Sequence, residues 1–328
     1  MALQRYNTQY TPPATLALII ANVAVAMLDI FNDGLLERLL WARGIDVQYG
    51  QYWRLLGAAF VHADMMHIAF NMYGLWVLGV IFERLQGWRA MLVVYFVSLF
   101  GCSGLTMVFY DPMTPVVGAS GAVYGMFGAV LAFFFVKAGG RIAGLWEVPH
   151  ARMLLIWLAL GVYQSFQPGV SLLGHLGGFV PGVVLGMYYE QRYARKLDLW
   201  HKLGVAMTGA AVVFLCVFAC VPLTRSSWYS VRALRALENG DFERGDELLA
   251  QAGRRSRNNK GAQLLYVHLT VWRRYHQSQP KQYSVSVLRW PLTHPRGITE
   301  PDSAGAWFNF LSDPEDDAEA LESDSFAP

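Results

Sequence analysis

The sequence has 328 residues, of which 54% are hydrophobic and only 15% are charged, whereas an average soluble domain has roughly 25% charged residues. This composition excludes an ordinary soluble protein. The net charge is +2 at pH 7, and no basic stripe follows a helix face, so we expect no nucleic-acid partner. Cys102, Cys216 and Cys220 lie in apolar runs and predict neither a disulfide framework nor a metal site.

Charge divides the sequence into two parts. Residues 1–222 contain 13 Lys/Arg and 10 Asp/Glu, and the much shorter stretch 223–328 contains 13 and 14. We therefore predict a membrane-embedded part in the lipid bilayer, followed by a polar C-terminal part.

Seven apolar segments are candidates for crossing a bilayer, which takes about 20 mostly apolar residues. One of them, 153–166, is short, and we count it because the charges of the connecting segments then alternate correctly. The segments are residues 14–30, 62–82, 89–109, 116–136, 153–166, 172–189 and 203–222.

The basic residues predict the orientation. With the N-terminus inside, ten basic residues lie in the inner segments and only Arg38, Arg43 and Arg54 lie in the outer loops, in agreement with the positive-inside rule. The same alternation places the C-terminal part outside. The alternative is a cleaved signal peptide ending near residues 24–26, but Arg5 is the only basic residue before it.

The first outer connection, residues 31–61, mixes aromatic and charged side chains, a mixture typical of segments in the lipid headgroup zone. We expect it to lie half-embedded beside the helices.

Polar side chains inside apolar segments are expensive in a bilayer and are functional candidates. The second segment places His62, His67 and Asn71 in its outer half, and the last two share one helix face. Ser120 lies at the outer end of the fourth segment and His175 near the outer end of the sixth. Each residue alone is more often a hydrogen-bonding residue between helices. Their common depth favours one shared site near the outer face.

Small residues repeat every four positions in the fourth and sixth segments, so we expect these two helices to pack with their backbones in contact. This packing would bring Ser120 to His175. Gly118 suits a loop backbone with unusual dihedral angles, whose amides are free to face a substrate oxygen. The repeats are Gly121, Gly125 and Ala129 in the fourth segment and Gly174, Gly178, Gly182 and Gly186 in the sixth.

Five short motifs between about residues 50 and 190 occur together. They are Trp53-Arg54, the His62/His67/Asn71 series, Glu83-Arg84, Gly118-Ala119-Ser120-Gly121 with Tyr124, and Gly174-His175-Leu176-Gly177-Gly178. In this combination the sequence resembles the rhomboid intramembrane serine proteases. The resemblance implies an all-α polytopic membrane protein with a six-helix catalytic core, to which residues 203–222 add a seventh transmembrane helix.

The resemblance implies a serine endopeptidase, a peptide-bond hydrolase with a Ser-His dyad and no cofactor. Ser120 is then the nucleophile, and His175 is the base that takes its proton. Tyr124, one turn below the serine, is placed to stack on the histidine.

The same resemblance implies an oxyanion site formed by the Ser120 backbone N–H and the side chains of His67 and Asn71. Gly118 would support it, and His62 would belong to a hydrogen-bonded or water-holding network at its mouth.

The implied substrates are transmembrane proteins cut at or near the outer membrane face, and the expected location is the bacterial plasma (inner) membrane. The alternative is a non-catalytic rhomboid-like protein for membrane quality control or client binding. A third interpretation is a metal protein that uses His62, His67 and His175, although no HExxH motif supports it.

The sequence predicts five parts. Residues 232–252 resemble one tetratricopeptide unit, with a simple helical hairpin as the alternative, and this domain is a candidate for binding a protein partner. From Glu300 on there are nine acidic and no basic residues, which is typical of disorder. The parts are a short inner segment 1–13, a rhomboid-like core 14–190, a linker and seventh helix 191–222, a helical soluble domain 223–299 and an acidic tail 300–328.

Overall fold

The computed structural model describes residues 11–167, 169–194, 196–222, 225–255, 265–270 and 272–273. Within these residues the chain forms helices and one isolated β-bridge but no extended strand, which confirms the all-α prediction. Two compact units are present: residues up to 110 together with 114–221, and residues 111–113 together with those from 222 on.

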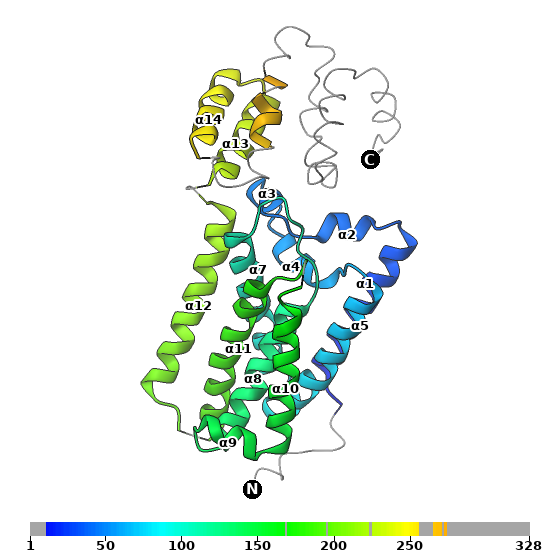
Figure 1. Ribbon diagram of the computed structural model, residues 1–328, viewed down its shortest axis with the longest axis vertical. Coiled ribbons are helices and arrows are strands. Elements are labelled where there is room, and N and C mark those ends of the chain that lie inside the picture. The colour runs from blue at the N-terminus through cyan, green and yellow to red at the C-terminus, as the bar shows by residue number, and fades with distance from the viewer. Residues whose placement is uncertain are drawn as a thin grey trace. The chain divides into compact units, whose positions relative to one another are not determined.

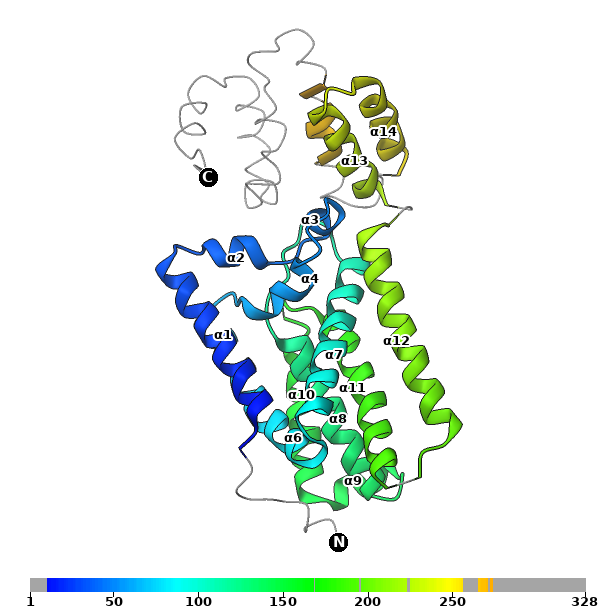
Figure 2. The same cartoon turned by 180° about the vertical axis from the view of Figure 1, so that it is seen from behind.

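The first unit is a bundle of long helices, with α1 and α12 at opposite edges in both views (Figures 1 and 2). Short helices cap its two ends. The long helices are α1 (Pro13–Phe31), α5 (Met65–Gly74), which continues through the π-helical turn η3 (Leu75–Gly79) into α6 (Val80–Gln86), α7 (Trp88–Phe109), α8 (Ser120–Lys137), α10 (Pro149–Gln164), α11 (Leu172–Tyr193) and α12 (Leu199–Cys220). The short ones are α2 (Leu35–Leu40), α3 (Gly44–Gln48), α4 (Arg54–Gly57), η2 (Ala58–Phe60) and α9 (Ile142–Glu147).

By length and composition alone, six helices of the described chain can cross a membrane: α1, the continuous α5 to α6, α7, α8, α11 and α12. The segment predicted as the fifth span, 153–166, corresponds to α10, which is not among the six. It has 16 residues and is about 24 Å long, less than the roughly 30 Å of the hydrocarbon core.

Helix α10 nevertheless returns the chain to the end of the bundle where α8 and α11 begin (Figure 1). Ser165, directly after α10, contacts Tyr124 in the second turn of α8 and His175 in the first turn of α11. The chain therefore reverses direction through α10, as the charge pattern requires. This reversal does not depend on α10 crossing the full bilayer.

The start of α8 differs from the prediction. The apolar run begins at residue 116, but the helix begins at Ser120, because Gly118 has a φ of 104° that no helix accepts. Ser120 is thus the first residue of α8, in agreement with its expected place at the outer end of the fourth segment.

The start of α5 also lies later than predicted. The side chain of Asp64 accepts a hydrogen bond from the backbone N–H of His67 at 2.8 Å and caps the helix, so that α5 begins at Met65. His62 therefore lies in the loop before the helix and not, as expected, within the second span.

Helices α8 and α11 pack with their backbones in direct contact, as the small-residue repeats predict. A Cβ atom added to Gly178 would overlap the carbonyl oxygen of Gly121. A Cβ atom added to Gly182 or Gly186 would also overlap the backbone of α8, so no larger side chain fits at these positions. The facing pairs are Gly178 with Gly121, Gly182 with Gly125, and Gly186 with Ala129.

Buried carboxylates tie the helices together at the end of the bundle opposite the start of α8. Glu83 in α6 accepts hydrogen bonds from the backbone N–H groups of Ala14 and Thr15 at 3.0 and 2.8 Å, and from the Thr15 hydroxyl at 2.7 Å. These bonds satisfy the N-terminus of α1, where a negative charge is favourable. Glu190 in α11 likewise forms an ion pair with Lys137 of α8 at 2.7 Å.

The connection 31–61 is folded into α2, α3, α4 and η2 rather than extended. Arg43 and Asp46 form a buried bidentate pair at 2.7 and 2.9 Å. Arg54 donates hydrogen bonds to the carbonyl oxygens of Arg38 and Trp41, both at 2.8 Å. Its location in the headgroup zone stays a prediction.

The described part of the second unit contains α13 (Ser226–Glu238) and α14 (Phe242–Arg255). The turn between them has Gly240 at a φ of 76°, followed by Asp241, whose side chain accepts from the backbone N–H of Arg244. The likeness to a tetratricopeptide unit and the five domain boundaries stay predictions. The acidic tail and most of the segment 1–13 lie outside the described residues.

We expect Gly178→Val to destabilise the protein by at least about 2 kcal/mol, because a branched side chain must push α8 and α11 apart. The matched control is Gly209→Val in α12, where an added Cβ meets no atom within 4 Å. Thermal unfolding in detergent compares the two. Equal midpoints for both variants would contradict the backbone contact.

Candidate active site

Ser120 and His175 meet at the adjoining ends of α8 and α11. The Nε2 atom of His175 lies 3.0 Å from the Oγ atom of Ser120, and only 8% of the histidine surface is exposed. A hydroxyl within hydrogen-bond distance of an imidazole is the arrangement in which the imidazole can take the hydroxyl proton. The structure thus brings together the two residues that the sequence singled out.

The ring of Tyr124 stacks on the imidazole of His175, with ring centroids 4.0 Å apart and an angle of 10° between the planes. Tyr124 lies four residues after Ser120 and so on the same face of α8. The stack restrains the tilt of the imidazole, and its presence is what the rhomboid resemblance implies.

A second serine contacts the other side of the imidazole. The Oγ atom of Ser165 lies 2.6 Å from Nδ1 of His175 and 3.3 Å from Oη of Tyr124. Ser165 is 3% exposed. The sequence analysis missed it, because it is a single serine after the least certain apolar segment and no periodic pattern marks it.

Contacts from the connection 31–61 hold the loop before Ser120 in place. Ala42 and Val116 form an antiparallel bridge with hydrogen bonds of 3.0 and 2.9 Å, and the N–H of Gly118 donates to the carbonyl oxygen of Ala58 at 2.7 Å. The folded connection therefore fixes the backbone that leads into the serine.

Helix α5 places His67 and Asn71 against this loop. A Cβ atom on Gly118 would lie 2.6 Å from Nε2 of His67 and 3.4 Å from Nδ2 of Asn71. Glycine is needed here both for its positive φ and for this close approach. Both side chains thus lie beside the segment that ends in Ser120.

Each of these two side chains has a nitrogen that can donate a hydrogen bond. Nδ1 of His67 accepts a hydrogen bond from the N–H of Ala63 at 3.4 Å, which favours the tautomer with the proton on Nε2. Nδ2 of Asn71 is buried and has no hydrogen-bond partner among the described residues. A buried donor without a partner is uncommon and calls for an explanation.

His62 lies beside His67, with ring centroids 5.1 Å apart. Burial lowers the pKa of His62 to about 4, so its ring is uncharged at neutral pH. In the part of the chain that the structure describes, no group of three or more His, Cys, Asp or Glu residues could hold a metal ion. The role of His62 in a network at the mouth of the site stays a prediction.

The first turn of α11 is fixed by Ser171, whose side chain accepts a hydrogen bond from the N–H of Gly174 at 2.9 Å. The same hydroxyl lies 3.2 Å from the hydroxyl of Thr106 in α7. This cap sets the position of His175 in the first turn of its helix.

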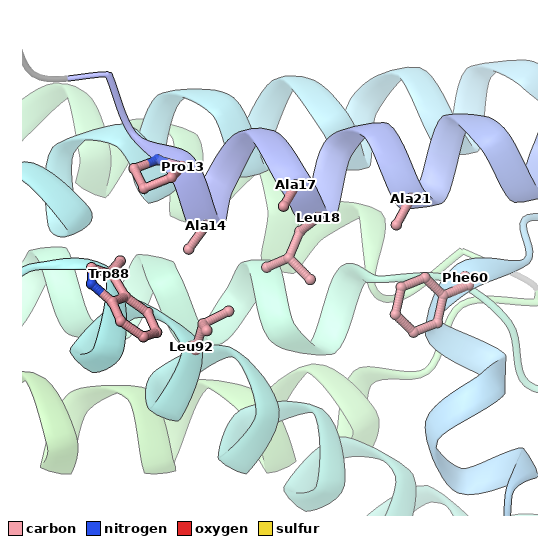
Figure 3. A pocket seen from close by; sticks show the side chains of 8 residues that line it. All are labelled: Pro13, Ala14, Ala17, Leu18, Ala21, Phe60, Trp88 and Leu92. Atoms are coloured by element: carbon pink, nitrogen blue, oxygen red, sulfur yellow. The ribbon is translucent and has the colours of Figure 1, made fainter.

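A separate apolar groove of about 460 Å³ lies between α1 and the start of α7 (Figure 3). Its lining offers no group for proton transfer or ion binding, and none of the lining residues belongs to the Ser120 site. The lining residues are Pro13, Ala14, Ala17, Leu18, Ala21, Phe60, Trp88 and Leu92.

Comparison with known proteins identifies the family. The family model of the rhomboid domain matches residues 49–192, a range that includes every residue of the site. YdcA of Bacillus subtilis (strain 168), a protein named for this family, is 31% identical over 155 residues, which cover 46% of this chain and 74% of YdcA. The chain belongs to the rhomboid family.

Other rhomboid relatives match over longer stretches. The rhomboid protease GluP of Bacillus subtilis is 28% identical over 225 residues, 67% of this chain but only 42% of GluP. The rhomboid protease GlpG of Pectobacterium atrosepticum is 26% identical over 200 residues, 56% of this chain and 67% of GlpG. Family and apolar helices together make this rhomboid a multi-pass integral membrane protein.

We expect Tyr124→Ala to slow the reaction of Ser120 with a fluorophosphonate probe by about tenfold, because an aromatic pair is worth up to about 1.5 kcal/mol. Tyr124→Phe keeps the stacked ring and should lose less than half of this effect. Labelling rates of purified protein in detergent measure both. If Tyr124→Ala labels as fast as the parent, the stack has no part in positioning His175.

Proposed function

We propose that this rhomboid is an intramembrane serine endopeptidase that cleaves transmembrane proteins at or near the outer membrane face. The observation that carries the proposal is the 3.0 Å contact between Ser120 Oγ and His175 Nε2 at the adjoining ends of two packed helices. The similarity to GluP and GlpG, which are both named rhomboid proteases, supports it.

In the proposed reaction Ser120 Oγ attacks the scissile carbonyl carbon while His175 Nε2 takes the hydroxyl proton. His175 then gives this proton to the leaving amine as the C–N bond breaks, which leaves an acyl-enzyme. A water molecule attacks the acyl carbon in the same way and restores the serine. The stack with Tyr124 holds the imidazole in plane during both proton transfers.

The negative charge on the carbonyl oxygen needs hydrogen-bond donors that are in place before the reaction. The backbone N–H of Ser120 is the first of α8 and has no intrahelical acceptor. We propose that Nε2–H of His67 and Nδ2–H of Asn71 complete the site, because both atoms lie next to Gly118, two residues before the serine.

The proposed substrate class follows from the surroundings of the site. Ser120 and His175 lie on membrane-spanning helices, so a substrate has to reach them at membrane depth. The substrate helix has to unwind there, because a helical carbonyl is already hydrogen-bonded within its own segment.

The proposed location is the bacterial plasma membrane, with the site near the outer face. The positive-inside bias supports this orientation, and three of the relatives are bacterial, although others come from Arabidopsis thaliana and Toxoplasma gondii. A protein partner for the C-terminal helical domain stays a prediction.

Ser120→Ala and His175→Ala are each expected to abolish cleavage of a model transmembrane substrate, and the double variant should lose no more, because both residues serve one proton transfer. His201→Ala is the control, since this histidine pairs with Asp198 beside α12. Probe labelling and substrate cleavage by purified protein are the measurements. A folded parent protein that neither labels nor cleaves would instead favour a non-catalytic client-binding rhomboid.

Asn71→Ala should lower kcat by up to about 100-fold while some activity remains, because two other donors are left for the oxyanion. The unfolding midpoint should stay close to that of the parent protein, since the Asn71 amide nitrogen has no described partner to lose. Parental kcat values for both Asn71→Ala and His67→Ala would exclude these side chains from the oxyanion site.

A further inference from the structure

Both ring nitrogens of His175 contact a serine hydroxyl. Ser120 Oγ lies 3.0 Å from Nε2, and Ser165 Oγ lies 2.6 Å from Nδ1. Ser165 follows the last residue of α10, and its side chain is almost completely buried. The position that a carboxylate holds in a Ser-His-Asp triad is therefore occupied by a hydroxyl.

The hydrogen bonds of Ser165 favour one position for the proton of His175. A serine hydroxyl has one proton and two lone pairs. Its proton is used by the carbonyl oxygen of Gly161, 2.8 Å away, which can only accept. This bond favours the Ser165 oxygen as an acceptor toward Nδ1 of His175, and therefore a proton on Nδ1.

Tyr124 is the third hydrogen-bond partner of the Ser165 hydroxyl, after Gly161 and His175. Its Oη lies 3.3 Å from Ser165 Oγ and can donate to the second lone pair. Ser165 then uses its proton and both lone pairs. If the hydroxyl instead donated to Nδ1, the Gly161 carbonyl would keep only the bond from the Ser165 backbone N–H, at 3.0 Å, and Nε2 would carry a proton that faces Ser120.

We propose that Ser165 is a positioning residue, which holds His175 in the tautomer whose Nε2 lone pair faces Ser120. This inference rests on the proposed function of the Ser120 site. A base needs that lone pair, and once His175 is doubly protonated the Nδ1–H bond to Ser165 persists. The short helix α10 thereby contributes to the reaction without touching the substrate, because it delivers the hydroxyl and the Gly161 carbonyl that orients it.

Ser165→Ala is expected to lower kcat by about tenfold with KM unchanged, since it removes one buried hydrogen bond to the base and nothing from the substrate-binding surface. Ser165→Thr keeps the hydroxyl and should restore at least half of the activity. The matched control is Ser103→Ala, which removes another buried hydroxyl that donates to a backbone carbonyl, that of Leu55.

The tautomer itself is measured by the 15N chemical shifts of His175 in histidine-labelled protein, assigned by comparison with His175→Ala. We expect Nδ1 to be protonated in the parent protein and both tautomers to be populated in Ser165→Ala. Protonation of Nε2 in the parent protein, or unchanged shifts in a folded Ser165→Ala, would overturn the proposal. If Ser165→Ala does not fold, the proposal is tested by the His175 tautomer of the parent protein and by the activity of Ser165→Thr.

The outcomes separate this proposal from the proposed function. If the parent cleaves substrate, Ser120→Ala does not, and Ser165→Ala has the kcat of Ser103→Ala, the role of Ser165 is wrong and the protease function stands. If the parent cleaves no substrate, the protease function fails, and the 15N shifts still decide whether Ser165 sets the tautomer.

Discussion

The backbone contact between α8 and α11 is the constraint on which the candidate site depends. In a bilayer, helices gain little from hiding apolar surface from water, so close packing of small residues has to hold them together. Gly121, which directly follows Ser120, contacts Gly178, which lies one turn after His175. The register of the small-residue contact between α8 and α11 therefore sets the distance between the Ser120 hydroxyl and the His175 imidazole. A shift of one residue along either helix would separate the two groups.

Much of this could be predicted from the sequence, because the decisive signals are local and periodic. Apolar length predicts helices α1, α7, α11 and α12 to within a few residues, and the four-residue glycine spacing predicts the contact of α8 with α11. The placement of Ser120, His175, His67 and Asn71 at one depth follows from those lengths together with the charge alternation.

The remaining features depend on tertiary contacts that no periodicity reveals. The loop before Ser120 is held by hydrogen bonds with Ala42 and Ala58, more than 55 residues earlier in the chain. The pairing of Ser165 with His175 depends on where the short α10 ends relative to α11. A single serine carries no pattern, so this contact becomes visible only when the three helices are placed together.

Buried polar groups in this bundle differ in whether a hydrogen-bond partner is present among the described residues. The buried carboxylate of Glu83 accepts three hydrogen bonds from α1 and so ties α1 to α6. Asn71 is buried to a similar degree, yet its amide nitrogen has no partner among the described residues. An unpaired donor inside a membrane protein is costly. The lack of a described partner supports the proposal that the Asn71 amide donates a hydrogen bond to the oxyanion.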